Sequence, residues 1–511
     1  MIETIRVIGA GTMGRGIAQT AIAAGVTVEL TDLSEQAVTA AVEFITAMMR
    51  RSVEKGARTS EEASAALDLL RTGAAPTDAT DSVDLVVEAV VERLEVKQKL
   101  FAELEKVAPR ALLASNTSSI PISAIASVLE RPENMIGLHF FNPVPLMKLV
   151  EVIPGLRTAS ANVQAAREFA TRLGHTPVLA QDTPGFLVNH LGRALVTEGL
   201  ALLSEQAASV ADIDRIVRDV LGFKMGPFEL MDLTGLEVSH PVMINVSNGF
   251  YGDPRLRPSP LAEARVTANL LGRKSGEGFY AYADGRPVIP AELAITADSA
   301  ATSVHVHESP ALADALRSAG VDVVETSSPT AVSVVTPLGE PVHRVALTAG
   351  LDTTRTIGVD PLSVGTGRLV AVIPPSLEPS AGRAAVQAIA AATEHLTITS
   401  DGPAPVAQRI LATVVNLGCA LAEQSIGSPA DIDLGARLGL GYPAGPLELG
   451  DRTNPDTIVT ILDGLHRYTG DPRYRASGWL RSRAELGMSL TARGTSPHDL
   501  IDRSSAPAHN S

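Results

Sequence analysis

Residues 4–19 read TIRVIGAGTMGRGIAQ, and this stretch decides the fold of the N-terminal part of the chain. The β-rich run TIRVI is followed by a turn with glycines at positions 9, 11 and 14, and the turn opens a helix. In such a strand–turn–helix unit the first glycine permits the tight turn, the second lets the backbone approach a pyrophosphate, and the third lets the helix pack on the strand. Gly9, Gly11 and Gly14 therefore predict a dinucleotide site, with the phosphates at the helix N-terminus.

A carboxylate stands where such a site needs one. Asp32 ends the next β-run, VTVELTD, 18 residues after Gly14, and a carboxylate there would bind the ribose diol of the adenosine. An acidic side chain also repels a 2′-phosphate, so NAD is favoured over NADP as the cofactor. The alternative is a glycine-rich turn in an α/β fold without cofactor, and the agreement of turn, helix and distant Asp32 speaks against it.

The predicted secondary structure changes along the chain. Strands alternate with helices over residues 1–182, which predicts a parallel sheet covered on both faces. Residues 183–282 read as helices, because apolar residues recur there at three- and four-residue spacing. An α/β texture without a glycine fingerprint returns at 283–400 and predicts a small degenerate α/β domain. The tail, 495–511, is rich in Ser, Pro and Ala and is predicted to be disordered.

Residues 401–494 repeat the helical domain. The segment 209–235 aligns without gaps with 428–454 at a constant offset of 219. The matched pairs are Asp212 with Asp431, Pro227 with Pro446, Glu229 with Glu448, and Asp232 with Asp451. Self-similarity of this kind indicates a true duplication. Because only the helical domain is seen to repeat, we expect the N-terminal motifs to occur once and the chain to have one active site.

Composition excludes several classes of function. A chain of 511 residues is expected to form about three or four domains. The formal net charge of −15 argues against nucleic acid and anionic membranes as partners. A single cysteine, Cys419, excludes an intramolecular disulfide and a cysteine-based zinc cage, and no metal site is predicted. With neither an export signal nor a membrane span in view, we expect a cytoplasmic protein.

Seven motifs follow one another along the chain: GAGTMGRGIAQ, DLVVEAVVE, SNTSSI, GLHFFNPVPLMKLVEVI, DTPGFLVN, MGPFELMDLTG and GRKSGEGFY. Together they resemble the L-3-hydroxyacyl-CoA dehydrogenases, NAD-dependent enzymes of β-oxidation, over residues 1 to about 282. The resemblance implies a Rossmann-type NAD-binding domain followed by an all-α, 6-phosphogluconate-dehydrogenase-like helical domain. The longer layout, with a degenerate α/β domain and a second helical domain, resembles long bacterial members of the family. Those act on 3-hydroxyadipyl-CoA in phenylacetate degradation or on 3-hydroxybutyryl-CoA.

The resemblance assigns catalysis to two residues of GLHFFNPVPLMKLVEVI, His139 and Glu151. We expect both at or near the ends of two β-runs joined by the turn NPVP. Oxidation of a secondary alcohol needs a base for the hydroxyl proton, and histidine suits this role. A carboxylate on the far ring nitrogen would fix the tautomer and stabilise the imidazolium. The alternative is a partly buried histidine beside an unrelated glutamate.

Three polar residues complete the implied site. Ser118 in SNTSSI matches the family serine that hydrogen-bonds substrate and cofactor, and otherwise would be a turn or cap residue. Asn142 matches an asparagine near the nicotinamide ribose and the substrate, and its alternative role is turn formation before Pro143. Asn189 in PGFLVN corresponds to the helical-domain asparagine that positions the substrate, and it could equally be a helix-surface amide.

Charged residues are assigned to the cofactor in the same way. Glu92 and Lys97 in VERLEVK, and Lys274 in GRKSGEGFY, align with family positions that contact NAD. Each could equally be a solvated surface charge. The nearest basic cluster for the phosphates of an acyl-CoA substrate consists of Arg50, Arg51 and Lys55.

The second helical copy departs from the first at positions that would touch ligand. Asn189 maps to Gln408 and Gly185 to Ala404, and the segment GRKSGEGFY has no counterpart. We therefore expect the second copy to be structural. Short family members dimerise through this domain, so the fused copy could cover the same face and leave either a homodimer or an internally paired monomer.

The leading hypothesis is NAD-dependent oxidation of (3S)-3-hydroxyacyl-CoA to 3-oxoacyl-CoA. A dehydrogenase of free 3-hydroxyacids is one alternative, although that class is expected to use a lysine of the helical domain in place of His139. A non-catalytic NAD-binding homologue is the other. The acyl chain length, recognition of a terminal carboxylate and the direction of the reaction stay open at this point.

Overall fold

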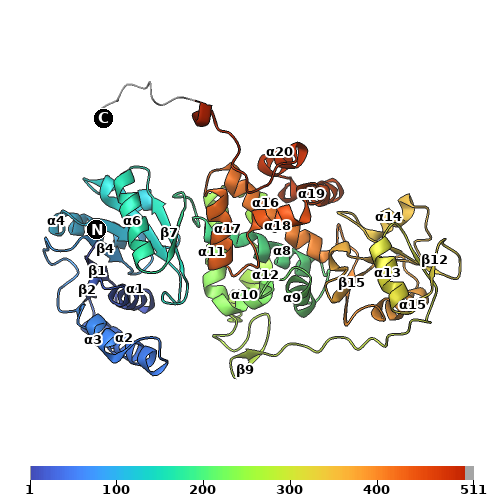
Figure 1. The fold of residues 1–511 in the computed structure, drawn as a ribbon, viewed down its shortest axis with the longest axis horizontal. Helices are drawn as coiled ribbons and strands as arrows, with labels where there is room; N and C mark the ends of the chain where they lie inside the picture. Colours follow the sequence, from blue (N-terminus) through green and yellow to red (C-terminus); the bar gives the residue numbers. More distant parts are fainter. Residues whose placement is uncertain (1, 501–511) are drawn as a thin grey trace.

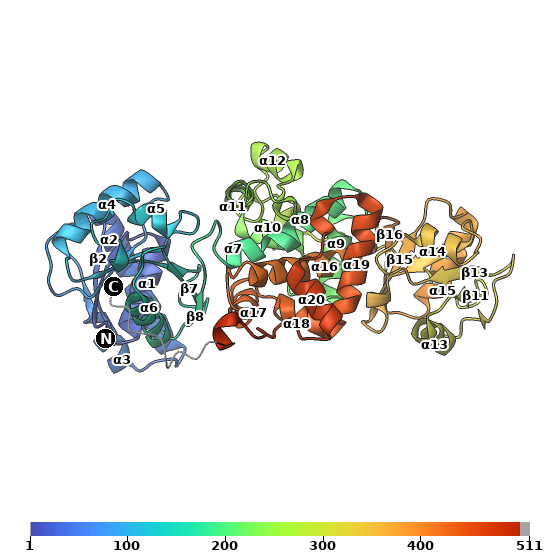
Figure 2. The ribbon, with the colours of Figure 1, turned by 90° about the horizontal axis from the view of Figure 1, so that it is seen from above.

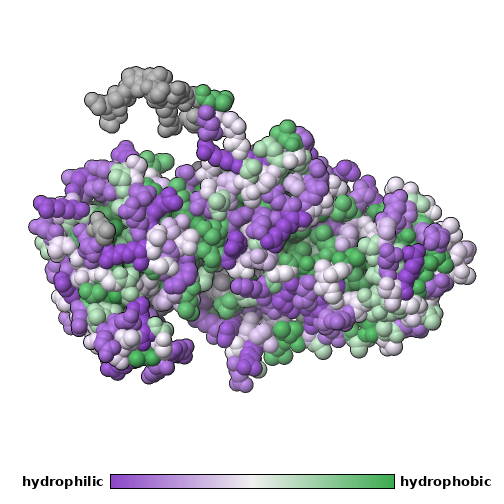
Figure 3. All heavy atoms as spheres, in the orientation of Figure 1, coloured by the Kyte–Doolittle hydropathy of each residue, from purple (hydrophilic) through white to green (hydrophobic). Residues whose placement is uncertain are grey.

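The computed structural model describes residues 2–500 as three bodies in a row. An N-terminal α/β domain and a second α/β domain flank a central helical body, which is built from two segments far apart in the sequence (Figures 1 and 2). Figure 3 shows a hollow between the N-terminal domain and the helical body at the lower edge of that face.

The N-terminal domain has the predicted Rossmann-type fold. Its eight-stranded sheet has the order β3-β2-β1-β4-β5-β6-β7-β8, and all pairs are parallel except β6 with β7. The strands are β1 (Thr4–Ile8), β2 (Thr27–Thr31), β3 (Leu70–Arg71), β4 (Leu85–Glu88), β5 (Leu112–Ser115), β6 (Met135–Phe140), β7 (Leu149–Pro154) and β8 (Thr176–Leu179). The helices are α1 (Thr12–Ala23), α2 (Glu35–Glu54), α3 (Ser60–Leu67), α4 (Leu94–Val107), α5 (Ile122–Ala126) and α6 (Ser160–Arg172).

Two helical segments form the central body. The first contains α7 (Val188–Leu191), α8 (Arg193–Ser204), α9 (Val210–Asp219), α10 (Pro227–Thr234), α11 (Leu236–Gly249) and α12 (Pro260–Thr267). The second contains α16 (Val406–Glu423), α17 (Pro429–Gly439), α18 (Pro446–Thr453), α19 (Pro455–Thr469) and α20 (Gly478–Leu486). Helix α16 is long and apolar enough to cross a membrane, but 89% of it is buried. It is therefore a core helix of this body.

The two copies pair about a pseudo-twofold axis. The Gln181 N–H donates to the Ile426 carbonyl (2.9 Å), and the Ser400 N–H donates to the Ala207 carbonyl (2.8 Å). Both donors and both acceptors differ by the repeat offset of 219, so the same bond is made in both directions. Such reciprocity is the property of an isologous interface between identical subunits.

Two further features lie at this pseudo-twofold interface. Phe223 and Tyr442, which also differ by 219, pack edge to face with ring centroids 4.8 Å apart, as a residue on such an axis must contact its own equivalent. A buried ion pair joins Arg409 of α16 to Glu198 of α8 (2.7 Å), and the Tyr474 hydroxyl also donates to Glu198 (2.9 Å). Removing one partner of a buried pair costs about 3–5 kcal/mol, so this network binds the halves together.

The second α/β domain has a six-stranded sheet of order β12-β11-β13-β14-β15-β16. Its strands are β11 (Val304–Val306), β12 (Val323–Val324), β13 (Val332–Val335), β14 (Thr356–Val359), β15 (Arg368–Ile373) and β16 (His395–Ser400). The helices are α13 (Pro310–Ser318), α14 (Val342–Thr348) and α15 (Pro379–Ala390). A short hairpin, β9 (Tyr282–Ala283) with β10 (Arg286–Pro287), and the link 288–303 precede the sheet.

The duplication is larger than the sequence comparison indicated. Strands β13 to β16 pair parallel, antiparallel and parallel, as β5 to β8 do. Asp182 caps the backbone N–H groups of Ile122 and Ser123, and Asp401, at the repeat offset, caps those of Val342 and His343. The expectation that only the helical domain repeats is therefore wrong. The copied strands kept buried aliphatic residues but lost the polar motifs, which removed the signal from the sequence.

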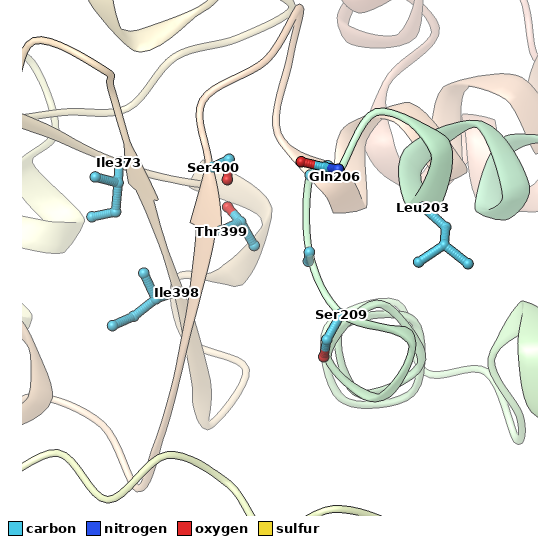
Figure 4. Close-up of a pocket in the computed structure, with 9 residues that line it drawn as sticks. Leu203, Gln206, Ser209, Ile373, Ile398, Thr399 and Ser400 are labelled. Atoms are coloured by element: carbon cyan, nitrogen blue, oxygen red, sulfur yellow. The ribbon is translucent and has the colours of Figure 1, made fainter. Parts of the chain in front are cut away.

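A crevice of about 370 Å³ separates the first helical segment from the second sheet (Figure 4). Residues of the α8–α9 connection and of β15 and β16 line it, among them Gln206, Ser209 and Thr399. It contains none of the residues that the sequence assigned to catalysis. At the C-terminal end, residues 497–500 form a 3-10 turn, and residues 501–511 of the tail predicted to be disordered lie outside the described residues.

Candidate active site

The glycine turn has the geometry that its sequence predicts. Gly9 has a φ of +105°, and a Cβ on Gly14 would lie 1.7 Å from the Gly9 carbonyl oxygen, so neither position accepts a side chain. A Cβ on Gly11 would meet nothing within 4 Å, which leaves the turn open at the N-terminus of α1, where a pyrophosphate would bind. The Asp32 carboxylate accepts from the N–H groups of Ala10 (2.8 Å) and Ser34 (2.9 Å) and so stands beside the turn. These residues fit an NAD dinucleotide.

Glu92 and Lys97 hold the loop that carries Ser118. The Lys97 ammonium is buried and lies 2.6 Å from Glu88 and 3.2 Å from Glu92. Glu92 in turn accepts hydrogen bonds from the backbone N–H of Ser118 (3.0 Å) and the Thr117 hydroxyl (2.6 Å). Lys97 is therefore not the solvated charge that the sequence left possible, whereas Glu92 is exposed and at the same time paired with Lys97. Direct contact of either residue with NAD stays a prediction.

The electrostatics of Glu92 follow from these contacts. Burial by itself would raise the pKa of Glu92, but the Lys97 ammonium and the hydrogen bonds from Thr117, Ser118 and Ser119 outweigh it, so the pKa lies below its ordinary value. Glu92 therefore stays ionised and accepts the hydrogen bonds that hold the loop of Ser118 in place.

The structure brings His139 and Glu151 together. They lie directly opposite each other in the antiparallel β6–β7 ladder, and His139 Nδ1 is 2.6 Å from Glu151 Oε2. The strands are joined by residues 141–148, a longer connection than the predicted NPVP turn. Because an ionised carboxylate can only accept, Nδ1 carries the proton and the lone pair of Nε2 is free. The pair can therefore take a proton from a substrate hydroxyl.

Glu151 also fastens the N-terminal domain to the helical body. Its Oε1 accepts from the backbone N–H groups of Leu187 (2.9 Å) and Val188 (2.8 Å), where α7 begins. The carboxylate is fully buried. Sequence reasoning did not find these two donors, because backbone groups leave no side-chain signal. The motif DTPGFLVN that contains them was the available pointer.

Ser118 and Asn189 also meet across the two domains. The Asn189 side-chain amide donates to the Ser118 carbonyl (3.3 Å), so it is directed at the site and is not merely a surface amide of the helix. Asn142 is exposed at the end of β6, in a cis peptide bond with Pro143. The Asn116 side chain, which sequence reasoning did not single out, accepts from the Phe140 N–H (2.8 Å) and ties the Ser118 loop to the histidine strand.

The remaining predicted residues lie on the surface. The Lys274 side chain is 79% exposed and pairs with Glu237 of the helical body (3.3 Å), so its contact with NAD stays a prediction. The basic cluster at the end of α2 is exposed, and its side chains make no ion pair within residues 2–500. Its members are Arg50, Arg51 and Lys55.

Helix α17 of the second copy packs directly behind the catalytic pair. A Cβ on Gly439 would lie 2.8 Å from Val188 Cγ1 and 2.9 Å from Leu149 Cδ2. A Cβ on Gly435, one turn earlier, would lie 3.3 Å from Leu187 Cδ2. The two glycines thus form a groove that seats the side chains of the residues whose N–H groups hold Glu151.

The equivalent place in the second copy has no catalytic pair. Asp360 lies opposite Val370, to whose carbonyl its N–H donates (2.9 Å), so the positions of His139 and Glu151 hold an aspartate and a valine. Gln408, the counterpart of Asn189, donates to the Asp360 carboxylate (3.0 Å) and to the Pro337 carbonyl (2.9 Å). Gln408 thus occupies Oδ1 of Asp360, whereas Oδ2 is buried without a hydrogen-bond partner among the residues described. Burial raises the pKa of Asp360 to about 6.

Comparison with known families supports this geometry. The chain matches the family described as "3-hydroxyacyl-CoA dehydrogenase, NAD binding domain" over residues 4–183. It matches "3-hydroxyacyl-CoA dehydrogenase, C-terminal domain" twice, over residues 185–282 and 406–496, in agreement with the two helical copies.

Individual relatives cover either the whole chain or its first half. The 3-hydroxyadipyl-CoA dehydrogenase of Escherichia coli (strain K12) is 36% identical over 95% of this chain and 98% of its own length. A probable 3-hydroxybutyryl-CoA dehydrogenase of Bacillus subtilis is 39% identical over 55% of this chain and 98% of its own length. The crystal structure of an Escherichia coli 3-hydroxybutyryl-CoA dehydrogenase superposes with a TM-score of 0.84 at 34% identity and covers 95% of this chain and 99% of that one.

The buried carboxyl group of Asp360 gives a stability prediction. Its folded pKa of about 6 lies above the usual value near 3.9, so ionisation opposes folding and stability falls as the pH rises from about 4 to about 6. Asp360→Asn removes this cost and keeps an acceptor for Gln408. Urea unfolding at pH 8 should show the variant more stable by about 2–3 kcal/mol, with no difference below about pH 4. A pH-independent difference, or a less stable variant at pH 8, would contradict this account.

Proposed function

The chain belongs to the 3-hydroxyacyl-CoA dehydrogenase family and is an NAD-dependent oxidoreductase, and we propose that it oxidises (3S)-3-hydroxyacyl-CoA to 3-oxoacyl-CoA at the His139–Glu151 pair. The hydrogen bond of 2.6 Å between His139 Nδ1 and Glu151 carries this proposal, because it leaves Nε2 as a base inside an NAD-binding domain. The names of the two long relatives suggest 3-hydroxyadipyl-CoA or 3-hydroxybutyryl-CoA as the substrate. A place in phenylacetate degradation would require the first of these.

The residues divide the work as follows. Gly9, Gly11 and Gly14 would hold NAD at the turn, and the bound cofactor would supply the acceptor for the hydride that leaves C3 of the substrate. His139 Nε2 takes the proton of the 3-hydroxyl group, and Glu151 stabilises the imidazolium that results. Ser118 and Asn189, one from each domain, hold the hydroxyl and acyl groups in position. A base acting in this way contributes about 10²–10⁴-fold to the rate.

A dehydrogenase of free 3-hydroxyacids is not favoured by the geometry. The helical-domain residue that reaches the Ser118 loop is Asn189, an amide, whereas the rival class would be expected to place a lysine there. His139 instead provides the base.

His139→Gln tests the proposed function. The amide keeps a polar group in place but cannot accept the proton, so kcat for 3-hydroxyacyl-CoA oxidation should fall by about 10²–10⁴-fold. NADH formation measured at 340 nm reports activity, and NADH fluorescence titration should give an unchanged Kd. Asp360→Asn, which changes the equivalent position of the second copy, is the matched control and should keep full activity. Retained activity in His139→Gln would refute the role of the pair, and lost activity in the control would refute a single site per chain.

We also propose that the second copy takes the place of a partner subunit. The reciprocal hydrogen bonds and the Phe223–Tyr442 contact support this, because they fill an isologous interface from within one chain. Light scattering coupled to size exclusion should give a mass near that of one chain, 53.3 kDa. A dimer that persists on dilution would mean that another surface pairs.

Helix α17 is proposed to position the catalytic pair through Leu187 and Val188. In Gly439→Ala the new methyl group meets Val188 Cγ1, so α7 must shift by a few tenths of an ångström and Glu151 with it. We expect kcat to fall by about tenfold, because a displaced Glu151 orients His139 less well toward the substrate hydroxyl. KM for NAD should stay unchanged. Gly402→Ala, whose Cβ would meet nothing within 4 Å, is the matched control. An unchanged kcat in Gly439→Ala, or a loss shared equally by kcat and the KM for NAD, would contradict the positioning role.

A further inference from the structure

Arg193, the first residue of α8, is a buried cation without an acidic partner. The residue is only 8% exposed. Its Nε donates to the Asn189 carbonyl (2.9 Å), its Nη1 makes a long contact with the Ser239 carbonyl (3.4 Å), and no protein group accepts from Nη2 within residues 2–500. Within residues 2–500, no carboxylate forms an ion pair with the Arg193 guanidinium. Such a group is costly to bury, and buried charges in proteins are normally paired.

Arg409 shows how this protein treats a buried arginine that serves structure. It lies at the same interface and pairs with Glu198 and Glu205. Burial alone would lower the pKa of Arg409, but these carboxylates and Tyr474 outweigh it and raise the pKa above its ordinary value. Burial instead lowers the pKa of Arg193 to about 10. Arg409 is therefore paired with carboxylates, as buried arginines usually are, whereas Arg193 is not.

A second unsatisfied group stands beside Arg193. The hydroxyl of Tyr442, from the second copy, is buried and finds no hydrogen-bond partner among the residues that the structure describes. A Cβ on Gly192, the residue before Arg193, would lie 3.1 Å from Leu440 Cδ2, so the segment that carries Tyr442 packs beside the start of α8. The electrostatic effect of Tyr442 on the pKa of Arg193 agrees with this placement. Each of them can donate hydrogen bonds to one anion.

The pseudo-twofold axis supplies an internal control for this pair. At the repeat offset of 219, Arg193 corresponds to Ala412 and Tyr442 corresponds to Phe223. One side of the interface therefore carries an arginine and a tyrosine, and the other carries an alanine and a phenylalanine. The polar pair occurs only on the side of the complete catalytic pair, which indicates that it serves the reaction and not the packing of the halves.

The position of Arg193 suits one end of a short acyl chain. It follows Asn189 by four residues, about one helical turn, across the short break at Gly192 between α7 and α8. Side chains of helices lean toward the N-terminus, and the Nε contact with the Asn189 carbonyl shows that the guanidinium does so. In a six-carbon dicarboxylic acyl group, three carbon–carbon bonds separate C3 from the terminal carboxyl carbon. That link is short, so a group that binds the carboxylate must lie close to the residue that positions the C3 end, as Arg193 does through its bond to the Asn189 carbonyl.

We propose that Arg193 and Tyr442 bind the terminal carboxylate of a dicarboxylic 3-hydroxyacyl-CoA. The guanidinium would supply its free Nη2 and one further N–H, and the tyrosine hydroxyl would complete the set of donors. This assignment rests on the proposed function, since it places the carboxylate relative to a C3 hydroxyl at His139. It makes a residue of the second copy part of the substrate site, and it selects the dicarboxylic substrate over the four-carbon one.

Two substrates of equal length isolate the carboxylate. The kcat/KM values for 3-hydroxyadipyl-CoA and 3-hydroxyhexanoyl-CoA differ only through the terminal group, and the native enzyme should favour the former. Arg193→Met, which keeps volume and removes charge, should lower the ratio of the two values by about 10–100-fold, the worth of a hydrogen bond to a charged group. Arg193→Lys should keep part of the preference, and Tyr442→Phe should lower the ratio by about five- to tenfold.

Stability provides a second readout. If Arg193 serves the substrate, its burial in the free protein is a cost, and Arg193→Met should unfold at the same temperature or a higher one. A structural arginine would instead give a lower unfolding temperature and equal losses on both substrates, which would overturn the proposal. An unchanged ratio in Tyr442→Phe would overturn the part assigned to the second copy, even if Arg193→Met does not fold. Failure of His139→Gln to lose activity would refute the proposed function itself and is therefore separate from these outcomes.

Discussion

The carboxylate of Glu151 is the interaction on which the site depends. One oxygen holds His139 Nδ1 and the other holds the N–H groups of Leu187 and Val188. Because the carboxylate is fully buried, its charge must be satisfied by these donors or the fold would bear the cost. The same group therefore orients the base and docks the helical domain on the sheet. A change in the angle between the domains would act directly on the histidine.

The second half of the chain supports this arrangement from behind. Its glycines at 435 and 439 let α17 approach the start of α7, at a cost of about 0.5–1 kcal/mol each relative to alanine within a helix. The Arg409–Glu198 pair joins α8 to α16, and α17 packs against α16. A half that lost its own catalytic pair has thus kept the packing that the other half needs. This explains why its sequence preserves helix starts and caps and not polar motifs.

The sequence was sufficient where side chains and fixed spacings carry the function. The glycine turn, Asp32 and the Rossmann-type fold follow from local rules of turn, helix and strand, and the helical repeat was visible as a constant offset. The His139–Glu151 contact was an expectation from resemblance, and the ladder register places the two opposite each other. The sequence could not predict the backbone donors of Leu187 and Val188 or the groove of α17, because both depend on tertiary packing. The copied half-sheet was missed because aliphatic strands of β13 to β16 resemble any buried strand.

The asymmetry of the interface carries the argument furthest. After duplication, both sides of a pseudo-twofold axis begin with the same residues and the same packing. A residue that later differs between the two sides therefore indicates a function that only one side has. Asp360 and Gln408 show one outcome, in which the former site became a closed polar contact. Arg193 and Tyr442 show the opposite outcome on the side that has the catalytic pair. The Arg193 guanidinium bonds only to backbone carbonyls, and the Tyr442 hydroxyl has no hydrogen-bond partner among the residues described. The pair of an arginine and a tyrosine occurs only on the side of the catalytic pair, and an anionic ligand bound there would offset the cost of burying it.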